Sequence, residues 1–240
     1  MELRLNPWQR FLLVAAMLAI AVLFTVHQGG IAWYVNRFSD PATLWSTAFI
    51  LVIFFAIFLL QGGGGALLMQ REVRALRLLQ SEGFAAVSSM PHSHLAVVLD
   101  DFEQCASVIS VRKMKVDPFV EYYETVVTGS ISALTRSKEI LVTLGILGTV
   151  AGITLGLSSA QDVSVMNAEG VQQYTLAALQ GVALSYTTTL FALLGALIIY
   201  YLAAGFQPVV DRMVATFGVA LERELLMRNK LEGGDDGTSS

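Results

Sequence analysis

An uncharged stretch from Leu141 to Ala160, LVTLGILGTVAGITLGLSSA, limits most strongly what this chain can fold into. A helix of this length is about long enough to cross the hydrocarbon core of a bilayer. Its glycines are ordered: Gly148, Gly152 and Gly156 are spaced four residues apart, and Gly145 precedes Gly148 by three. Because a helix turns by about 100° per residue, all four lie in one narrow glycine stripe. Such a stripe lets another helix backbone approach closely within lipid.

A second apolar span, Tyr174–Tyr201, follows after a short polar loop and carries hydroxyl groups where mid-membrane is expected. On the first helix, Thr149 lies at the edge of the glycine stripe. The hydroxyl-bearing residues on the second helix are Ser185, Tyr186, Thr187, Thr188 and Thr189. Two such helices joined as a hairpin are typical of the lining of a path rather than of a plain anchor.

The composition predicts an all-α polytopic membrane protein. Of the 240 residues, 55% are hydrophobic and only 14% are charged, whereas a soluble domain carries about 25% charged residues. The small net charge of −4 argues against nucleic-acid binding. The single cysteine, Cys105, excludes an internal disulfide, and neither it nor His92 and His94 has partners at ligand spacing, so we expect no metal site. No cofactor is expected.

The pattern along the chain predicts four transmembrane helices, of which the third and fourth extend into the cytoplasm. The first apolar run lacks a convincing cleavage site and is interpreted as a retained span. Gly62–Gly65 are interpreted as a close-packing patch, with a local helix break as the alternative. The predicted segments are 1–70 with the first two spans (about 11–32 and 44–69), 71–138 as a cytoplasmic helical region in which Gly83–His94 is a loop, 139–205 as a transmembrane hairpin (about 140–160 and 171–204), 206–230 as a cytoplasmic helix and 231–240 as a disordered tail.

The placement of basic residues predicts the orientation. The N-terminus, residues 71–138 and the C-terminus hold nearly all Lys and Arg, whereas the two short loops hold only Arg37. The positive-inside rule then places both termini in the cytoplasm.

The four spans contain no Asp, Glu, Lys or Arg, and His27 lies at a span edge. Proton relays through membranes normally need an intramembrane acid or base, and threonine hydroxyls do not titrate in this range. If the chain conducts protons, the titrating carboxylate therefore comes from a partner. In the alternative interpretation, the threonines only bond backbone carbonyls of their own helices.

Two motifs carry a resemblance to a known family. Leu144–Gly156, LGILGTVAGITLG, and Gly181–Leu197, GVALSYTTTLFALLGAL, resemble the MotA/TolQ/ExbB family of ion-channel subunits of rotary inner-membrane motors. The first matches a pattern LG-aliphatic-LGTV-x-G. In the second, Gly181 and the pair Thr188–Thr189 match a pattern G-x-x-x-A-x-x-T-T-x-x-G, while Ser185 and Ala192 replace other small residues. The hairpin covers about a quarter of the chain.

The resemblance implies a homo-pentamer in a bacterial inner membrane, around two copies of a single-span partner similar to MotB, TolR or ExbD that carries a membrane aspartate. It also implies that Thr149 and Thr189 face the ion path, with Thr188 as the next candidate. Four spans are similar to the flagellar-stator branch, whereas the motif wording is closer to TolQ and ExbB. The driven process and the choice between H⁺ and Na⁺ stay open.

Two other functions are weighed against an ion-driven motor subunit, which is a channel protein rather than a classical enzyme. One is a structural membrane scaffold whose glycine faces only assemble helices. The other is a secondary transporter, which is disfavoured because the sequence has no internal repeat and no pair of discontinuous spans.

The orientation is testable by cysteine labelling from either side of the membrane. A cysteine at Ser164 should react with a membrane-impermeant maleimide from the periplasm, and one at Ser93 only from the cytoplasm. The opposite pattern would overturn the charge argument.

Overall fold

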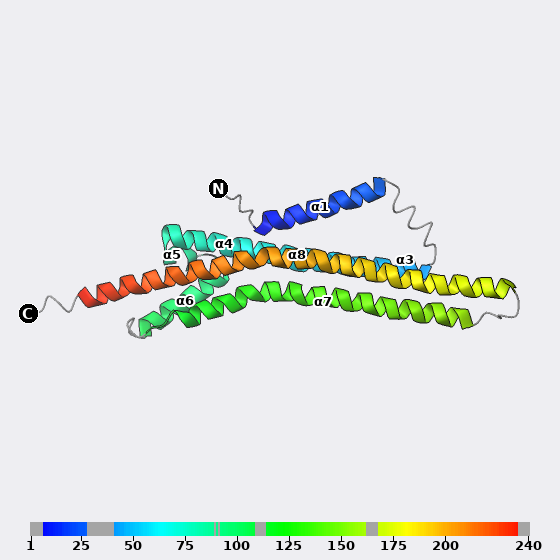
Figure 1. The fold of residues 1–240 in the computed structure, drawn as a ribbon. Coiled ribbons are helices and arrows are strands. Elements are labelled where there is room, and N and C mark those ends of the chain that lie inside the picture. The colour runs from blue at the N-terminus through cyan, green and yellow to red at the C-terminus, as the bar shows by residue number, and fades with distance from the viewer. Residues whose placement is uncertain are drawn as a thin grey trace, which may run out of the picture. The chain divides into compact units, whose positions relative to one another are not determined.

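The computed structural model describes residues 7–27, 41–88, 90, 92–108, 114–161 and 168–234, and every regular element in these ranges is helical (Figure 1). The predicted all-α class is therefore confirmed. The elements are α1 (Pro7–His27), α3 (Pro41–Ile57), the π-helix η1 (Phe58–Gly63), α4 (Gly64–Glu82), α5 (Phe84–Ser88), α6 (His94–Val108), α7 (Asp117–Gln161) and α8 (Ala168–Gly234).

Four helical segments are long and apolar enough to cross a membrane, as predicted. They are Pro7–Thr25, Leu44–Glu82, Asp117–Ser158 and Glu169–Lys230. The third and fourth are much longer than the roughly 20 residues a bilayer needs, so each reaches beyond it. The predicted continuation of the first span after His27, the turn with Arg37, the loop with Ser164 and the last six residues of the predicted tail lie outside the described residues.

Each of the two long helices contains a proline, at its first turn in α7 and in its interior in α8. Asp117 and Pro118 begin α7, where proline suits a first helical turn because its missing N–H is not needed there. The helix then continues without interruption into the uncharged stretch. Pro208 lies inside α8 without ending it, and α8 reaches Gly234, four residues into the segment predicted as a tail.

The chain forms two compact units. We call the first the polar unit; it contains Met1–Gln9, Gly64–Ser132 and Ala204–Ser240. The second, the membrane unit, contains Arg10–Gly63 and Ala133–Ala203. The long helices α7 and α8 contribute residues to both.

Aromatic and glycine contacts hold the first two spans of the membrane unit. The Phe11 ring stacks on Phe58 with 5.0 Å between centroids. A methyl group on Gly62 would lie 2.7 Å from Leu202 Cδ2 and 3.3 Å from the Phe11 ring, whereas one on Gly64 would meet nothing within 4 Å. The close-packing interpretation therefore holds for Gly62 but not for Gly64, and the helix is widened into a π-helix at this point rather than broken.

The polar unit has a compact core of aromatic and aliphatic side chains. The Tyr123 and Phe217 rings are 4.8 Å apart, and Phe102 packs edge-on against Phe119 at 5.4 Å. The prediction of a loop over Gly83–His94 is wrong in part, because α5 forms within it. Its Val87 is fully buried and Phe84 packs on Phe102, so tertiary contacts stabilise a helix too short to be recognised from sequence.

A buried carboxylate connects three helices of the polar unit. Glu72 of α4 is fully buried. The backbone N–H groups of His94 and Leu95, at the start of α6, donate to it at 2.8 and 3.1 Å. Ser93 Oγ donates at 3.2 Å, and the Tyr123 hydroxyl of α7 at 3.4 Å. Glu72 thus caps the N-terminus of α6, which favours negative charge.

The Tyr123 phenol stays a donor to this carboxylate. It lies between Glu121 and Glu124, outside the uncharged part of α7. Burial raises the pKa of the Tyr123 phenol, and the charge of Glu72 and the hydrogen bond to it act in the same direction. The neutral, hydrogen-donating form is therefore favoured.

This network changes the choice of labelling position. Ser93 is only 4% exposed and is bonded to Glu72, so a cysteine there would be shielded from a maleimide. Ser81 is exposed near the end of α4 and is the better reporter of the same side.

We predict that Glu72→Gln destabilises the polar unit by about 1.5–3 kcal/mol, because an uncharged amide replaces a carboxylate that accepts from four donors. Thermal unfolding of the purified protein in detergent measures the effect. Glu82→Gln, an exposed position on the same helix, serves as the matched control and should change stability by less than about 0.5 kcal/mol. Equal unfolding temperatures for the two variants would contradict the capping role.

Candidate functional site: a hydroxyl cluster in the hairpin of α7 and α8

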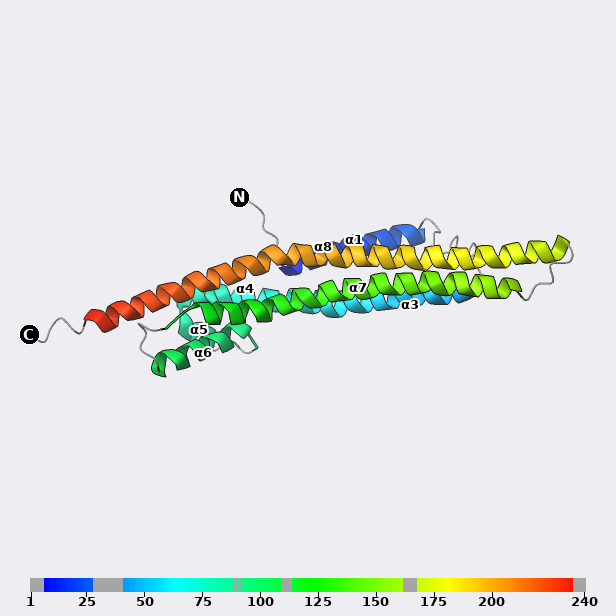
Figure 2. The same cartoon turned by 60° about the horizontal axis from the view of Figure 1, so that its bottom comes forward.

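Helices α7 and α8 run side by side (Figure 2). Within the membrane unit, the glycine stripe of α7 is the surface on which α8 packs. A methyl group added to Gly145 would lie 2.7 Å from Ala192 Cβ, and one on Gly148 would lie 2.6 Å from Thr188 Oγ1. Residue numbers rise along α7 as they fall along α8, so the helices are antiparallel and in contact along this stripe.

The closest approach of the two helices lies further along the stripe. A methyl group on Gly152 would lie 2.5 Å from Ser185 Oγ and 2.8 Å from the Gly181 carbonyl oxygen. One on Gly156 would lie 2.8 Å from the Gly181 Cα. A side chain larger than hydrogen would collide with the opposite backbone at Gly152 and Gly156. Their packing partner is the same chain, and the stripe by itself carries no argument for assembly between chains.

Thr149 and Thr189 meet across this narrow gap, hydroxyl to hydroxyl. Thr149 Oγ1 also lies 3.1 Å from the Gly145 carbonyl oxygen. Thr189 Oγ1 lies 3.2 Å from that same oxygen and 2.9 Å from the Ser185 carbonyl oxygen. Both side chains are half-buried, so the pair lies at the edge of the packed interface rather than in its interior.

Ser185 and Thr188 lie deeper in the same interface. Ser185 Oγ is 2.9 Å from the Thr149 carbonyl oxygen and 2.9 Å from that of Gly181, so it connects the two backbones. Thr188 is fully buried against Gly148, and its hydroxyl lies 2.9 Å from the Leu184 carbonyl oxygen. Thr188 therefore faces the packed interior, while Thr189 faces Thr149.

Tyr186 is not part of this cluster. Its side chain is 75% exposed, the most exposed of the predicted hydroxyl positions, whereas the neighbouring Ser185 is buried. Successive residues of a helix point about 100° apart, so Tyr186 projects from a different face of α8 than Ser185.

The hydrogen-bonding capacity of the threonine pair exceeds what any one arrangement uses. A hydroxyl has one proton to donate and two lone pairs that accept. The Thr149 and Thr189 hydroxyls share the Gly145 carbonyl oxygen as an acceptor, Thr189 also bonds the Ser185 carbonyl oxygen, and the two hydroxyls contact each other. Each can rotate to donate to another acceptor, and each retains acceptor capacity for a cation or water. A carboxylate, a water or a small cation are the kinds of ligand that such a pair of hydroxyls suits chemically.

The charged residues that flank the uncharged run indicate how deep in the membrane the Thr149–Thr189 pair lies. Glu139 and Asp162 bound the uncharged run. Thr149 comes ten residues after Glu139, about 15 Å along a helix axis, which is half of a hydrocarbon core of about 30 Å. At the Glu139 end, Lys138 Nζ lies 5.4 Å above the Tyr200 ring, a pairing typical of a membrane interface.

One polar contact at this boundary was not predicted. Ser137 Oγ donates to Gln61 Oε1 at 2.6 Å and so connects α7 to η1. A glutamine at the end of an apolar run was the available signal, but its partner lies 76 positions away.

Among the described residues, no group of three or more His, Cys, Asp or Glu side chains could hold a metal ion.

Comparisons with known proteins add no identification, since no family model and no curated protein matches the chain. A functional inference therefore depends on the two motifs and on the geometry of the hairpin.

We predict that Gly152→Leu prevents the hairpin from forming, because the new side chain would occupy the position of Ser185 and the Gly181 backbone. The yield of folded protein in mild detergent, measured by size-exclusion chromatography, should fall at least tenfold. Gly129→Ala on the same helix is the control, because a methyl group there meets nothing within 4 Å. A normal yield of the Gly152→Leu variant would refute the role assigned to close packing.

Proposed function

We propose that this chain is the ion-channel subunit of an inner-membrane motor complex, which couples an ion motive force to mechanical work through a single-span partner. The transported ion in this proposal is H⁺, with Na⁺ as the alternative. The observation that carries it is the Thr149–Thr189 hydroxyl pair, half-exposed at mid-span on two helices that are uncharged at this depth. The two motifs that resemble the MotA/TolQ/ExbB family support it.

The proposed chemistry needs a carboxylate that the spans of this chain do not supply. A partner helix would bring an aspartate beside the hairpin, where the threonine pair can donate to it. A hydrogen bond to a charged group is worth about 1.5–3 kcal/mol, so the hydroxyls favour the ionised aspartate. When the aspartate takes up a proton, these bonds weaken and the partner is released.

Alternation between the ionised, bound aspartate and the protonated, released aspartate would couple ion passage to movement of the chain relative to the partner helix. A ligand shifts an equilibrium only by the difference in its affinity for the two states. Here the difference is the strength of the hydroxyl–carboxylate contact before and after protonation. Repeated around a homo-pentamer that encloses two copies of the partner helix, each transfer would bias one step of rotation. The proposal places the complex in a bacterial inner membrane with both termini in the cytoplasm.

A structural scaffold is the second candidate, and a specific observation favours it. The hydroxyls of Thr187 and Thr188 lie within hydrogen-bonding distance of carbonyl oxygens of their own helix, as do those of Thr149 and Thr189. Hydroxyls used in this way satisfy the backbone and need no other ligand. In that case the hairpin would only support the packing of the membrane unit and would not conduct ions.

We predict that Thr149→Val combined with Thr189→Val lowers ion flux by about tenfold to a hundredfold, corresponding to the loss of one charge-assisted hydrogen bond. The variant should still assemble, because valine keeps the shape of threonine and the carbonyl oxygens keep their helical N–H donors. The assay is proton uptake by inverted membrane vesicles that contain the chain and its co-expressed single-span partner, followed with a pH-sensitive dye.

Matched controls are available on the same helices. Thr154 of α7 bonds the Val150 carbonyl oxygen and Thr187 of α8 bonds that of Ala183, but neither contacts the pair. Thr154→Val with Thr187→Val should leave the flux unchanged. Flux at the wild-type rate in the Thr149→Val, Thr189→Val variant would instead support the scaffold.

A further inference from the structure

The polar unit carries two rows of exposed charge, each on one helix. The basic row on α4 consists of Arg71, Arg74 and Arg77, and the acidic row on α7 consists of Asp117, Glu121 and Glu124. All six residues are exposed. Among the described residues, none of the six side chains takes part in an ion pair.

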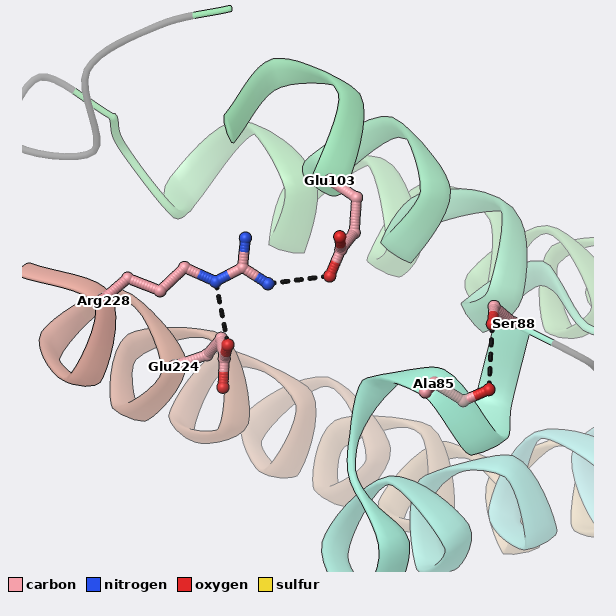
Figure 3. A network of polar contacts seen from close by, with 5 residues as sticks. All are labelled: Ala85, Ser88, Glu103, Glu224 and Arg228. Carbon is pink, nitrogen blue, oxygen red and sulfur yellow. Dashed lines mark hydrogen bonds and ion pairs between the residues drawn. The ribbon is translucent and has the colours of Figure 1, made fainter. Parts of the chain in front are cut away.

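Elsewhere in this unit, one arginine forms two ion pairs within the chain. Arg228 of α8 donates from Nη2 to Glu103 Oε1 at 2.7 Å and from Nε to Glu224 Oε1 at 2.8 Å (Figure 3). The hydrogen bond to Glu224 and the nearby Glu103 raise the pKa of Arg228. The two rows lack such pairing, although each has three charges of one sign in close succession.

The contact between α4 and α7 indicates where each row lies around its own helix. Glu72 and Tyr123 point toward each other and are buried. At about 100° per residue, the three arginines lie at least about 100° around α4 from Glu72, and the three carboxylates lie at least about 100° around α7 from Tyr123. Both rows therefore lie off the faces that carry the Glu72–Tyr123 contact, and among the described residues no ion pair joins one row to the other.

We propose that the basic row of one copy of this chain binds the acidic row of a second copy, head to tail. The rows match in number of charges and in length: at 1.5 Å per residue, Arg71 to Arg77 covers about 9 Å and Asp117 to Glu124 about 10 Å. Arginine and carboxylate pair in fixed, bidentate geometry, which gives register as well as attraction. When each copy offers its basic row to one neighbour and its acidic row to another, the interface is heterologous, and such interfaces generate a ring if the rotation between copies closes and an open filament if it does not.

This inference rests on the homo-oligomer of the proposed function and deepens it by naming an interface. An isologous dimer through either row is excluded by repulsion, because it would bring like charges together. Anionic phospholipid headgroups are the competing occupant of the basic row. They leave the acidic row without a partner, whereas a second copy satisfies both rows at once.

Disulfide crosslinking tests the interface in the full chain. In a Cys105→Ser background, each of the three arginines is replaced by cysteine together with each of the three carboxylates, giving nine paired variants. Oxidation in membranes should give a ladder of covalent multimers for at least one pair, because every copy offers both halves of the contact. The single-cysteine variants should stay monomeric, and co-expression of two matching singles should stop at dimers.

Charge reversal is a second experiment on the same interface, and it includes its own control. Replacing the three arginines by Glu, or the three carboxylates by Lys, should weaken self-association at least tenfold, as measured by mass photometry in detergent. Combining both replacements in one chain should restore association, because complementarity returns with inverted sign. Circular dichroism shows whether each variant remains helical. Raising the salt concentration should weaken the wild-type assembly, since ions screen exposed charge pairs.

The outcomes separate this inference from the proposed function. No crosslink in any of the nine pairs, or no restoration by the combined reversal, would overturn the interface. So would loss of bound phosphatidylglycerol on reversal of the basic row alone, with self-association unchanged. Because these readouts do not involve ion flux, an intact ladder in a protein without threonine-dependent flux would refute the channel and keep the interface.

Discussion

The contact between the α7 and α8 backbones is the constraint on which the membrane unit depends. Lipid offers no hydrophobic force that presses helices together, so association there relies on close packing and hydrogen bonds. Glycine at positions 148, 152 and 156 removes the side chains that would keep the backbones apart. Only at this separation can Ser185 reach the Thr149 carbonyl oxygen and the two threonine hydroxyls meet. The packing and the candidate chemistry are therefore consequences of the same small residues.

The same geometry explains why two functions compete for one cluster. A threonine that bonds its own helix satisfies itself, and in lipid that removes the penalty of an unpaired hydroxyl. The arrangement is uneven across the interface, however. Ser185 and Thr188 are buried, whereas Thr149 and Thr189 are half-buried and share the Gly145 carbonyl oxygen as an acceptor. A purely structural role does not need a half-buried hydroxyl pair at mid-span, whereas a channel needs hydroxyls near the surface of the hairpin.

Sequence periodicity predicted the four spans, the continuous α7 and the position of Thr149 at the edge of the glycine stripe. It left the choice between Thr188 and Thr189 open, because consecutive residues differ by about 100° and either could face the partner helix. Only the contact of Thr188 with Gly148 assigns the inner position. The Glu72 network was not predicted at all, since its donors lie 21 to 51 positions away and a mid-helix glutamate between arginines resembles a solvated residue. The short α5 was missed because tertiary burial of Val87 stabilises it.

The two units expose different kinds of surface, and this difference bears on how copies of the chain could recognise one another. Within the membrane unit the glycine stripe is already covered by α8, so it cannot also be the surface that selects a neighbouring copy. What remains exposed there is large and apolar, and such surface does not distinguish a protein neighbour from lipid. In the polar unit, by contrast, the exposed surface carries charge, and complementary rows can select both partner and register. If the chain assembles into a ring, the specificity of assembly is therefore expected outside the membrane, and the hairpin is left free to face a different partner.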